Sequence, residues 1–455
     1  MNETKDDFME IGIGLFGLGT VGSGVVKILQ DNAEQITKRT GAHLVVKQAV
    51  VRNLAKQRTG FRQNFPITDD PNDILANPAI QIVVEVMGSI DQAYTIIKQA
   101  LTAKKHVVTA NKDLIASRGQ ELVAIAEANG VDLFFEAAVA GGIPILRTLS
   151  TSFTADEISR VAGIINGTSN FILTQMATNH LSYHAALKLA QEKGFAESDP
   201  TNDVDGFDAA YKLIILANFA FGIQPVMADL TIQGITGLTD ADIADANSFG
   251  YALKLLGVAQ RVGETKDAIS IEVSPQLVPF THPLATVNNE NNAVLVNGES
   301  VGEVMLYGPG AGEMPTANSV LSDLTNVATD LALNTPGRPF NSFNQNIDLA
   351  KPSQRIARRF IVIEVDDTPG AMYSVTGMFA AAKISFTDLK QTPAANGTAR
   401  LVALTHPASD AQINLIRTTI RNADGINLAA EYKLFSWLQL KYQLLAQISA
   451  LVLTH

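Results

Sequence analysis

Five carboxylates and one lysine are packed into the segment GFAESDPTNDVDGFDAAYK: Glu197, Asp199, Asp203, Asp205, Asp208 and Lys212. Local structure accounts for two of the acids, because Asp205 is a natural N-cap for a following helix and Asp208 then falls at its N3 position. Asp208 and Lys212 are four residues apart, so they face the same side of that helix. The other acids leave two alternatives. One is a solvated acidic loop, and the other is a site whose carboxylates bind a cationic group and keep Lys212 protonated as a proton donor.

A second lysine, Lys112, follows the apolar run KHVVTAN, which reads as a strand. In open α/β sheets, ligands bind at the carboxyl ends of the strands. A lysine in that position can donate a hydrogen bond to a carbonyl oxygen that becomes an alkoxide, or it can neutralise a phosphate. The alternative is an ordinary surface lysine at the start of a helix.

A further carboxylate, Glu136, lies near the end of another apolar run in FFEAAVAGGIPILRTL, just before the pair Gly141 and Gly142. The glycine pair forces a turn that exposes backbone carbonyls. Carbonyl and carboxylate oxygens are hard ligands for a monovalent or divalent cation. The spacing fits a tight crossover into a second domain equally well.

The stretch IGIGLFGLGTVGSGVVKIL contains the pattern GxGxxG directly after a strand-like run and at the start of a helical one: Gly17, Leu18, Gly19, Thr20, Val21 and Gly22. In such a loop the first glycine permits the turn, the second lets a pyrophosphate approach the backbone, and the third lets the helix pack on the strand. The helix N-terminus then supplies the anion site. We therefore predict that this loop binds a dinucleotide rather than forming only a glycine-rich turn.

The next apolar run, HLVVKQAVV, ends in Arg52 instead of the acid that would grip a ribose 2′-hydroxyl, and Lys56 and Arg58 follow. A missing carboxylate with nearby cations suits a 2′-phosphate, so the sequence favours NADP, with NAD possible. Ordinary solvated loop cations are the alternative.

The elements that must position these residues alternate between strand and helix from residue 8 to about 140. The Val/Ile-rich runs are too apolar for either face of these strands to be exposed to solvent. This predicts an α/β, Rossmann-type parallel sheet covered by helices on both sides. Helical segments around 172–192 and 207–221, followed by long strand patterns, predict an α+β second domain. Residues 333–354 have the Pro, Asn and Ser content of a linker. After it we expect a small βαββα unit and an apolar tail over 436–455, more typical of an amphipathic helix than of a membrane anchor.

Composition excludes several classes of function. The chain has 455 residues, 46% of them hydrophobic and 17% charged, which is a globular composition with enough length for about three domains. A net charge of −11 without any basic run makes nucleic acid and anionic membranes poor partners. The absence of cysteine excludes disulfides and thiolate chemistry. The acidic start lacks the features of a signal peptide, so we expect a soluble, cytoplasmic protein.

The motifs GLGTVG, TANKDLIA, EAAVAGGIPI, GIINGTSNFILTQM and GFAESDPTNDVDGFDAAYK together resemble those of homoserine dehydrogenase, in the same order and spacing, over about residues 8–330. The resemblance implies NAD(P)H-dependent, reversible reduction of aspartate 4-semialdehyde to homoserine. It implies that Lys112 and Lys212 are the catalytic lysines, with Lys212 the favoured proton donor. Glu197 and Asp208 would hold the substrate's amino end, and Asp203 would support Lys212.

The same resemblance implies a sodium ion on Glu136 and on the carbonyls of Val139, Gly141 and Ile143. It places Gly167 and Gly312 near the cofactor. The C-terminal unit resembles an ACT regulatory domain, through the pattern Asp-x-Pro-Gly at residues 367–370. Threonine is the obvious effector to expect, although such a unit can also serve assembly alone.

The resulting domain prediction is a dinucleotide domain at 1–140 that is completed by 310–332, a catalytic and dimerisation domain at 141–310, and an ACT-like domain at 355–435. A homodimer or homotetramer is expected. Two other classes of function stay open: another two-domain oxidoreductase acting on an amino acid, and a sensor that binds NADP and an amino acid without turnover. Because the dinucleotide loop lies at the start of the chain, we expect no fused aspartokinase.

Overall fold

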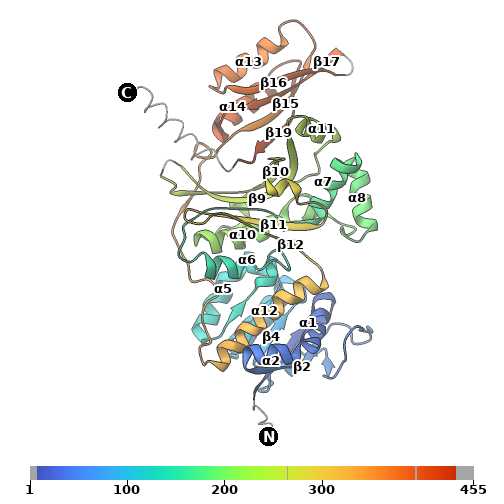
Figure 1. Cartoon of the computed structure of the whole chain (residues 1–455), viewed down its shortest axis with the longest axis vertical. Helices are drawn as coiled ribbons and strands as arrows, with labels where there is room; N and C mark the ends of the chain where they lie inside the picture. Colours follow the sequence, from blue (N-terminus) through green and yellow to red (C-terminus); the bar gives the residue numbers. More distant parts are fainter. Residues whose placement is uncertain (1–7, 264, 395–396, 437–455) are drawn as a thin grey trace.

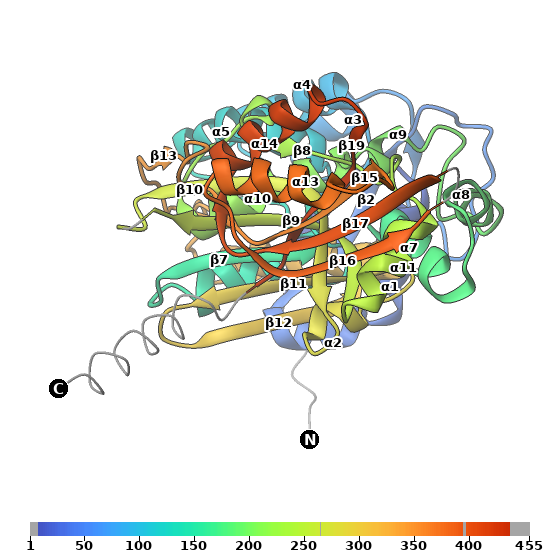
Figure 2. The same ribbon diagram turned by 90° about the horizontal axis from the view of Figure 1, so that it is seen from above.

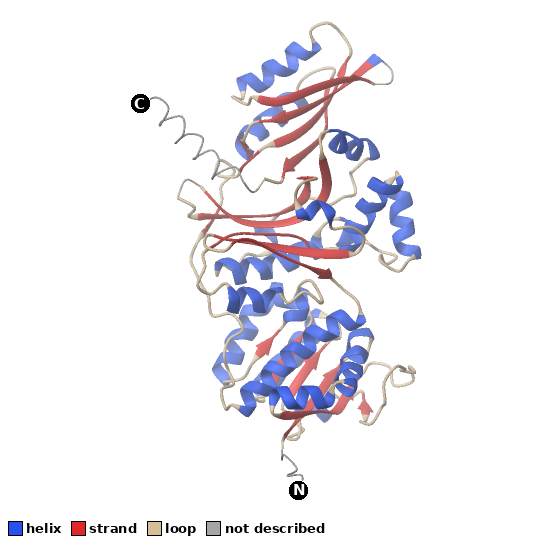
Figure 3. Ribbon diagram, in the orientation of Figure 1, coloured by secondary structure: helices blue, strands red, loops and turns tan. Residues whose placement is uncertain are grey.

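The computed structural model describes residues 8–263, 265–394 and 397–436. Three units follow one another along the longest axis of the molecule, in chain order (Figure 1). The first is built on a parallel sheet with helices on its faces, and the other two share a single larger sheet (Figure 3).

Six parallel strands form the first sheet, in the order β3-β2-β1-β4-β5-β6. They are β1 (Met9–Phe16), β2 (Ala42–Val50), β3 (Ile67–Thr68), β4 (Ile82–Glu85), β5 (His106–Thr109) and β6 (Leu133–Phe134). Strands β4 and β5 are buried along their whole length, as the apolar runs require. The predicted Rossmann-type sheet is thus confirmed, and its strand order reverses between β1 and β4, where such sheets bind their ligands.

Helices pack on both faces of this sheet: α1 (Thr20–Asp31), α2 (Ala33–Thr40), α3 (Asn72–Leu75), α4 (Ile90–Thr102), α5 (Lys112–Asn129) and, from far along the chain, α12 (Glu313–Ala332). Helix α12 lies against α1 so closely that a Cβ built on Gly24 would lie 3.0 Å from the Cβ of Ala317. Its apolar side chains Val320, Leu324 and Val327 are fully buried. The chain therefore returns to its first unit after building the second.

The second unit has an antiparallel sheet in the order β12-β11-β7-β9-β10. Its strands are β7 (Ile158–Ile164), β9 (Tyr251–Val262), β10 (Ala268–Pro279), β11 (Asn291–Gly298) and β12 (Gly302–Pro309), and the short strand β8 (Thr231–Ile232) pairs with β10 in parallel. Its helical turns and helices are η1 (Glu136–Ala138), α6 (Ile145–Arg147), η2 (Thr148–Ser152), α7 (Gly167–Asn179), α8 (Tyr183–Glu192), α9 (Thr201–Val204), α10 (Phe207–Phe221), η3 (Met227–Asp229), α11 (Asp240–Ser248) and η4 (Pro283–Thr286).

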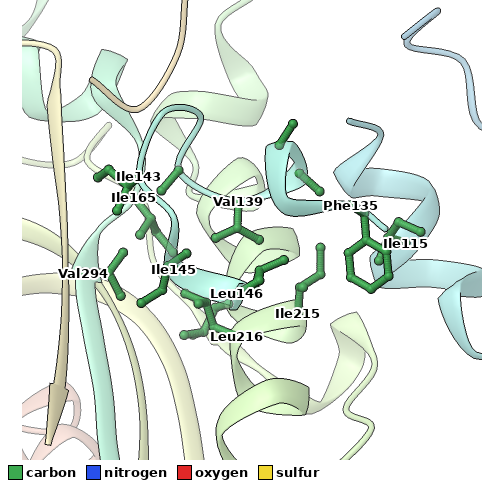
Figure 4. Packing of buried hydrophobic residues seen from close by; sticks show 14 of the residues in the cluster. Ile115, Phe135, Val139, Ile143, Ile145, Leu146, Ile165, Ile215, Leu216 and Val294 are labelled. Carbon is green, nitrogen blue, oxygen red and sulfur yellow. The ribbon is translucent and has the colours of Figure 1, made fainter. Parts of the chain in front are cut away.

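The almost wholly apolar helix α10 packs between this sheet and the first unit. Ile215 and Leu216 of α10 lie among side chains of the 139–146 segment, with Phe135 at the end nearer the first unit (Figure 4). One continuous hydrophobic core thus joins the two units, so that residues from both can be held in fixed relation.

The third unit consists of β15 (Arg359–Asp366), α13 (Ala371–Ala381), β16 (Phe386–Pro393), β17 (Thr398–Thr405), α14 (Asp410–Arg421) and β19 (Ile426–Leu434), with short strands β14 (Ile356–Ala357) and β18 (Ala408–Ser409) paired beside it. Its antiparallel strands lie in the order β19-β15-β17-β16. The βαββα order agrees with the sequence expectation, and β19 adds a sixth element that the sequence analysis did not include. Viewed from above, α13 and α14 lie over one face of these strands (Figure 2).

The second and third units are joined edge to edge. Strand β19 runs parallel to β10, with Gln276 opposite Lys433, so a single sheet extends through both units. The Lys433 ammonium also pairs with the Glu272 carboxylate of β10. Arg400 of β17 donates to Asp242 and Asp245 of α11, at 2.8 and 2.7 Å. The third unit is therefore attached by both backbone pairing and ion pairs.

The 333–354 segment is irregular, as its composition predicts, but it is anchored. Phe340 is buried against Phe134, Phe135 and Phe219, with ring centroids 5.1–5.2 Å apart. Further along, β13 (Asp348–Leu349) pairs with β10.

The helical segments expected around 172–192 are α7 and α8, which are separated where His180 adopts a left-handed conformation that ends α7. One local prediction was wrong. Asp205 is not the N-cap of α10: Gly206 holds that position with φ of +87°, and Asp208 consequently sits at N2 instead of N3. The tail expected over 436–455 lies, apart from Ser436, outside the described residues. Among the described helices, none is both long and apolar enough to cross a membrane.

Candidate functional site

Two lysines from different units converge on one buried carboxylate. The Lys212 ammonium lies 2.7 Å from Asp208 Oδ2, and the Lys112 ammonium lies 3.3 Å from Asp208 Oδ1. Lys212 also donates to the backbone carbonyl of Ile165 at 2.8 Å. The side chain of Asp208 is 12% exposed, as is that of Lys212, so bulk water screens this group little.

Asn166 organises the carboxylates of the cluster. Its side-chain amide donates to Asp203 Oδ1 at 2.7 Å and to Asp208 Oδ2 at 2.8 Å. Its amide oxygen caps α7 by accepting from the backbone N–H and the hydroxyl of Ser169. One side chain thus fixes the helix start and both acids together.

Each lysine is placed by a helix, Lys112 at the start of α5 and Lys212 in the second turn of α10. Lys112 is the first residue of α5, after β5, and the preceding Asn111 caps that helix by accepting from the Leu114 N–H at 3.2 Å. Asn111 also donates to the carbonyl of Ser89 at 2.8 Å, which joins the loops after β4 and β5. Lys212 lies one turn after Asp208 on α10, the shared face that the spacing predicts.

The charges in the cluster stabilise one another. Burial alone would lower the pKa of Lys112, but the Asp208 and Asp113 carboxylates outweigh it and raise that pKa above its ordinary value. Burial would raise the pKa of Asp208, but Lys212 and Lys112 hold it below the ordinary value. The pKa of Asp203 is raised by burial and by the nearby charge of Asp208. Lys112 is therefore an ammonium at neutral pH, able to donate hydrogen bonds but unable to act as a base.

Glu197 does not join this group. Its side chain is exposed, and its backbone carbonyl accepts from Gln191 at 3.1 Å. Among the described residues its carboxylate has no hydrogen-bond or ion-pair partner. The carboxylate is accordingly free to meet a ligand from solvent.

The glycine loop has the geometry that a dinucleotide requires. Gly17 has a φ of +102°, and a Cβ built on Gly22 would lie 2.2 Å from the Gly17 carbonyl oxygen. A Cβ on Gly19 would meet nothing within 4 Å, so space is open at that point of the loop. Gly19 precedes α1 without any side-chain cap, which leaves N–H groups at the helix start free for an anion. Leu18 is buried under the loop, and Thr20 and Val21 begin the helix.

The cations after β2 take different roles. Arg52 is exposed and lies two residues beyond the end of β2. Arg58 donates to the backbone carbonyls of Leu18, Lys56 and Asn53 at 3.1, 2.7 and 3.0 Å, and so clamps its own loop to the glycine loop. The sequence offered no signal for that clamp, because the contact spans 40 residues.

Glu136 is fully buried at the junction of the two units. Its carboxylate oxygens accept from the backbone N–H groups of Leu146 and Arg147, both at 2.8 Å. Burial, together with the charge of Asp323, raises its pKa to about 7. The carbonyls of Gly141 and Ile143 accept from the Ser319 hydroxyl and the Ile145 N–H. The donor set with Val139 is therefore all oxygen and buried, which fits a monovalent cation in type, and a cation there would offset the charge of Glu136.

The two remaining glycines each begin a helix. Gly167 starts α7, and a Cβ there would lie 2.6 Å from the Glu290 carbonyl oxygen. Gly312 precedes α12 with φ of +116°, and α12 packs on α1, the helix of the glycine loop.

Sequence reasoning missed two residues of this region. Asn166 lies within the motif GIINGTSNFILTQM, and the signal that could have found it is that Asn is a preferred N-cap residue before a helix. Glu85, fully buried at the end of β4, accepts from the Thr109 hydroxyl at 2.6 Å and the Met87 N–H at 2.7 Å. Burial raises its pKa. The apolar run around Glu85 gave no hint of this contact with β5.

Comparison with protein families gives two adjacent matches. Residues 17–136 match the model for the homoserine dehydrogenase NAD binding domain, and residues 144–325 match the model for homoserine dehydrogenase.

Individual proteins agree over nearly the whole chain. Homoserine dehydrogenase of Bacillus subtilis is 43% identical over 425 residues, which cover 93% of this chain and 97% of that protein. The crystal structure of a homoserine dehydrogenase from Thiobacillus denitrificans has a TM-score of 0.88 and 37% identity, covering 94% of this chain and 99% of that one. A hyperthermophilic archaeal homoserine dehydrogenase in complex with NADPH has a TM-score of 0.59 and 27% identity, covering 72% of this chain and 99% of that one.

Proposed function

The chain belongs to the homoserine dehydrogenase family of NAD(P)-dependent oxidoreductases, and from this premise we propose that the cluster around Asp208 is where aspartate 4-semialdehyde is reduced to homoserine. The observation that carries the proposal is the convergence of Lys112 and Lys212, from two units, on the single carboxylate of Asp208. Neither a second kind of oxidoreductase nor a ligand sensor requires that arrangement.

The two lysines act on the carbonyl that is reduced. A bound nicotinamide dinucleotide supplies the hydride in the forward direction. Lys212 donates one N–H group to Asp208 and another to the Ile165 carbonyl. Its third N–H group polarises the substrate oxygen and then protonates the alkoxide. Lys112 adds positive charge at the carboxyl edge of the parallel sheet.

The carboxylates hold the substrate's ammonium group, and Asp208 together with Asp113 keeps Lys112 charged. As the resemblance implies, Glu197 and Asp208 are proposed for the ammonium group, and Asp203, proposed to support Lys212, is a further substrate-binding candidate. Asp208 already pairs with two lysines, so the exposed Glu197 and one oxygen of Asp203 have the most capacity left.

An assay of NADPH oxidation with aspartate 4-semialdehyde tests the proposal directly. Turnover that depends on Lys212 is expected. Folded protein that binds NADPH without turnover would favour the sensor, and turnover only with another amino-acid substrate would favour a different oxidoreductase.

For the cofactor we propose NADP over NAD, on the support of Arg52 and the absence of an acid at the end of β2. The glycine loop Gly17–Gly22 with the start of α1 would hold the pyrophosphate. The archaeal relative bound to NADPH supports the same choice. Arg58 is engaged with backbone carbonyls, which leaves Arg52 and Lys56 as the cations for a 2′-phosphate.

Arg52→Ala should raise the KM for NADPH roughly ten-fold and leave the KM for NADH within two-fold, because only NADPH carries the 2′-phosphate that the guanidinium would pair with. The measurement is steady-state kinetics with both cofactors. Arg62→Ala, which removes another exposed arginine further along the same loop, is the control. An equal rise for both cofactors would remove Arg52 from the 2′-phosphate site.

We also propose that a sodium ion binds at Glu136 and the carbonyls of Val139, Gly141 and Ile143. The buried, all-oxygen donor set supports it. No step of the reaction needs the ion to touch substrate, so its role would be to stabilise the junction between the two units.

Exchanging sodium for choline at constant ionic strength should lower the melting temperature of the wild type by several degrees, because a ligand of the folded state stabilises it. Glu136→Gln should abolish that difference. Thermal unfolding in both salts is the measurement, with Glu127→Gln, an exposed acid of α5, as control. Equal melting temperatures in the two salts would argue against the ion.

The third unit is proposed to be ACT-like, binding an amino-acid effector such as threonine or serving assembly alone. Its ion pairs to α11 support a regulatory attachment. A homodimer or homotetramer and a cytoplasmic location are proposed on the basis of the family resemblance.

A further inference from the structure

A buried lysine lies outside the cluster just described. Lys254 of β9 is 4% exposed, and its ammonium donates to the Val287 carbonyl at 2.6 Å, to Asn288 Oδ1 at 3.1 Å and to Asn170 Oδ1 at 3.4 Å. None of these partners is charged. Burial is the one cause that lowers its pKa, to about 8. Burying an ammonium without a counter-ion costs free energy. We therefore ask what the hydrogen bonds of Lys254 hold in place.

Those contacts fasten the 287–291 turn to helix α7. The buried amide of Asn170 donates to the carbonyls of Val287, Asn289 and Asn291 at 3.2, 2.9 and 3.2 Å. The hydroxyl of Thr174 accepts from the Asn289 N–H at 3.0 Å. Asn289 has a φ of +58°, a left-handed conformation that is unfavourable for a residue other than glycine. Contacts from the surrounding residues must therefore stabilise this turn.

The 287–291 turn also packs against Gly167, the first residue of α7. A Cβ on Gly167 would lie 2.6 Å from the Glu290 carbonyl oxygen, so helix start and turn are in direct contact. The residue before Gly167 is Asn166, which donates to both Asp203 and Asp208. Asn170 lies one helical turn from Asn166, and its N–H donates to the Asn166 carbonyl.

We propose that Lys254 is a positioning residue for the reaction: through Asn170 and the 287–291 turn it holds the start of α7, and thereby the Asn166 amide between Asp203 and Asp208. The inference rests on the proposed role of the Asp208 cluster. Lys254 itself touches neither of the two lysines nor Asp208 among its hydrogen bonds. It acts by fixing the acceptor geometry around Lys212, and a small displacement of reacting groups can cost ~10²-fold in rate.

Lys254→Met keeps the length of the side chain and removes its donors. We expect kcat to fall roughly ten-fold while the KM for NADPH stays within two-fold of wild type. Lys105→Met is the matched control. Lys105 is also buried, also donates to two backbone carbonyls, those of Asn77 and Ile80 at 2.7 Å, and also has a pKa lowered by burial. It lies at the amino end of β5, away from the carboxyl edge, so its loss should lower the melting temperature and leave kcat unchanged.

A kcat within two-fold of wild type in Lys254→Met would overturn the inference, and so would an equal loss in Lys105→Met. Losses that multiply when Lys254→Met and Asn170→Ser are combined would also contradict it, because one shared path predicts non-additive effects. If Lys254→Met does not fold, Lys254→Gln keeps one donor and should still lose part of kcat. Full turnover in Lys212→Met would overturn the cluster's role, whereas full turnover in Lys254→Met alone would overturn only this inference.

Discussion

Replacing Lys212 with methionine is expected to lower kcat for aspartate 4-semialdehyde by about 10²–10⁴-fold, the range for removal of a positioned proton donor. The ammonium is held by Asp208 at 2.7 Å and by the Ile165 carbonyl at 2.8 Å, so its remaining N–H has a defined direction. Methionine fills the same space without donating. The binding of NADPH, measured by fluorescence titration, should stay within two-fold, because Lys212 lies on α10 of the second unit and not in the glycine loop.

Lys193→Met is the control for this variant, since Lys193 is an exposed lysine that follows α8 in the same unit. Its kcat should equal that of wild type. Near-normal turnover in Lys212→Met would remove the lysine from the chemistry. A matching loss of NADPH affinity would point to collapse of the site instead of loss of a proton donor.

Asp208→Asn should have the second-largest effect, a loss of roughly 10²-fold in kcat, because the change leaves two ammonium groups without their shared counter-ion. Asp208 is one of the two acids that raise the pKa of Lys112. Its removal therefore lowers that pKa, and the alkaline limb of the pH–rate profile should move to lower pH. The measurement is kcat as a function of pH for wild type and variant.

Asp199→Asn is the matched control, because Asp199 belongs to the same acidic run but is exposed, and its carboxylate accepts from the N–H and the hydroxyl of Thr201. It should change neither kcat nor the pH profile. An Asp208→Asn variant whose alkaline limb stays in place would show that Asp208 does not set the protonation of Lys112. Stability offers a second check. The pKa of Asp208 is depressed in the folded protein, so its contribution is present at neutral pH and is lost as pH falls through the carboxylate range.

Local sequence pattern was enough to predict the helices and strands whose apolar residues recur with one regular spacing. The glycine loop, the parallel strands and the presence of a helix around 207–221 all follow from runs of apolar residues and from spacing. Pattern also placed Asp208 and Lys212 on one helical face. It failed at the entry to that helix, because Gly206 in a left-handed conformation competes with Asp205 as the capping residue, and side-chain propensity alone does not decide between them.

The rest of the site depends on contacts that no local pattern encodes. Asn166 meets Asp203 and Asp208 across 37 and 42 residues, and Lys112 meets Asp208 only because the two units share a core. In the sequence, Lys254 is one polar residue within a strand pattern. Its burial results from packing of α7 and the 287–291 turn, which lie far from it in the sequence. The pairing of β10 with β19 likewise joins segments more than 150 residues apart.

The late return of α12 to the first unit has a consequence for synthesis of the chain. Strands and helices of residues 9–134 are translated early, yet one face of their sheet is completed by Val320, Leu324 and Val327 of a helix that ends at Ala332. Domains usually fold in the order in which they emerge from the ribosome. In this protein, the apolar surface of the first unit that α12 covers stays exposed until the whole second unit has been translated. The glycine loop, whose helix α1 packs on α12, therefore reaches its final geometry only after Lys112 and Lys212 have both been translated.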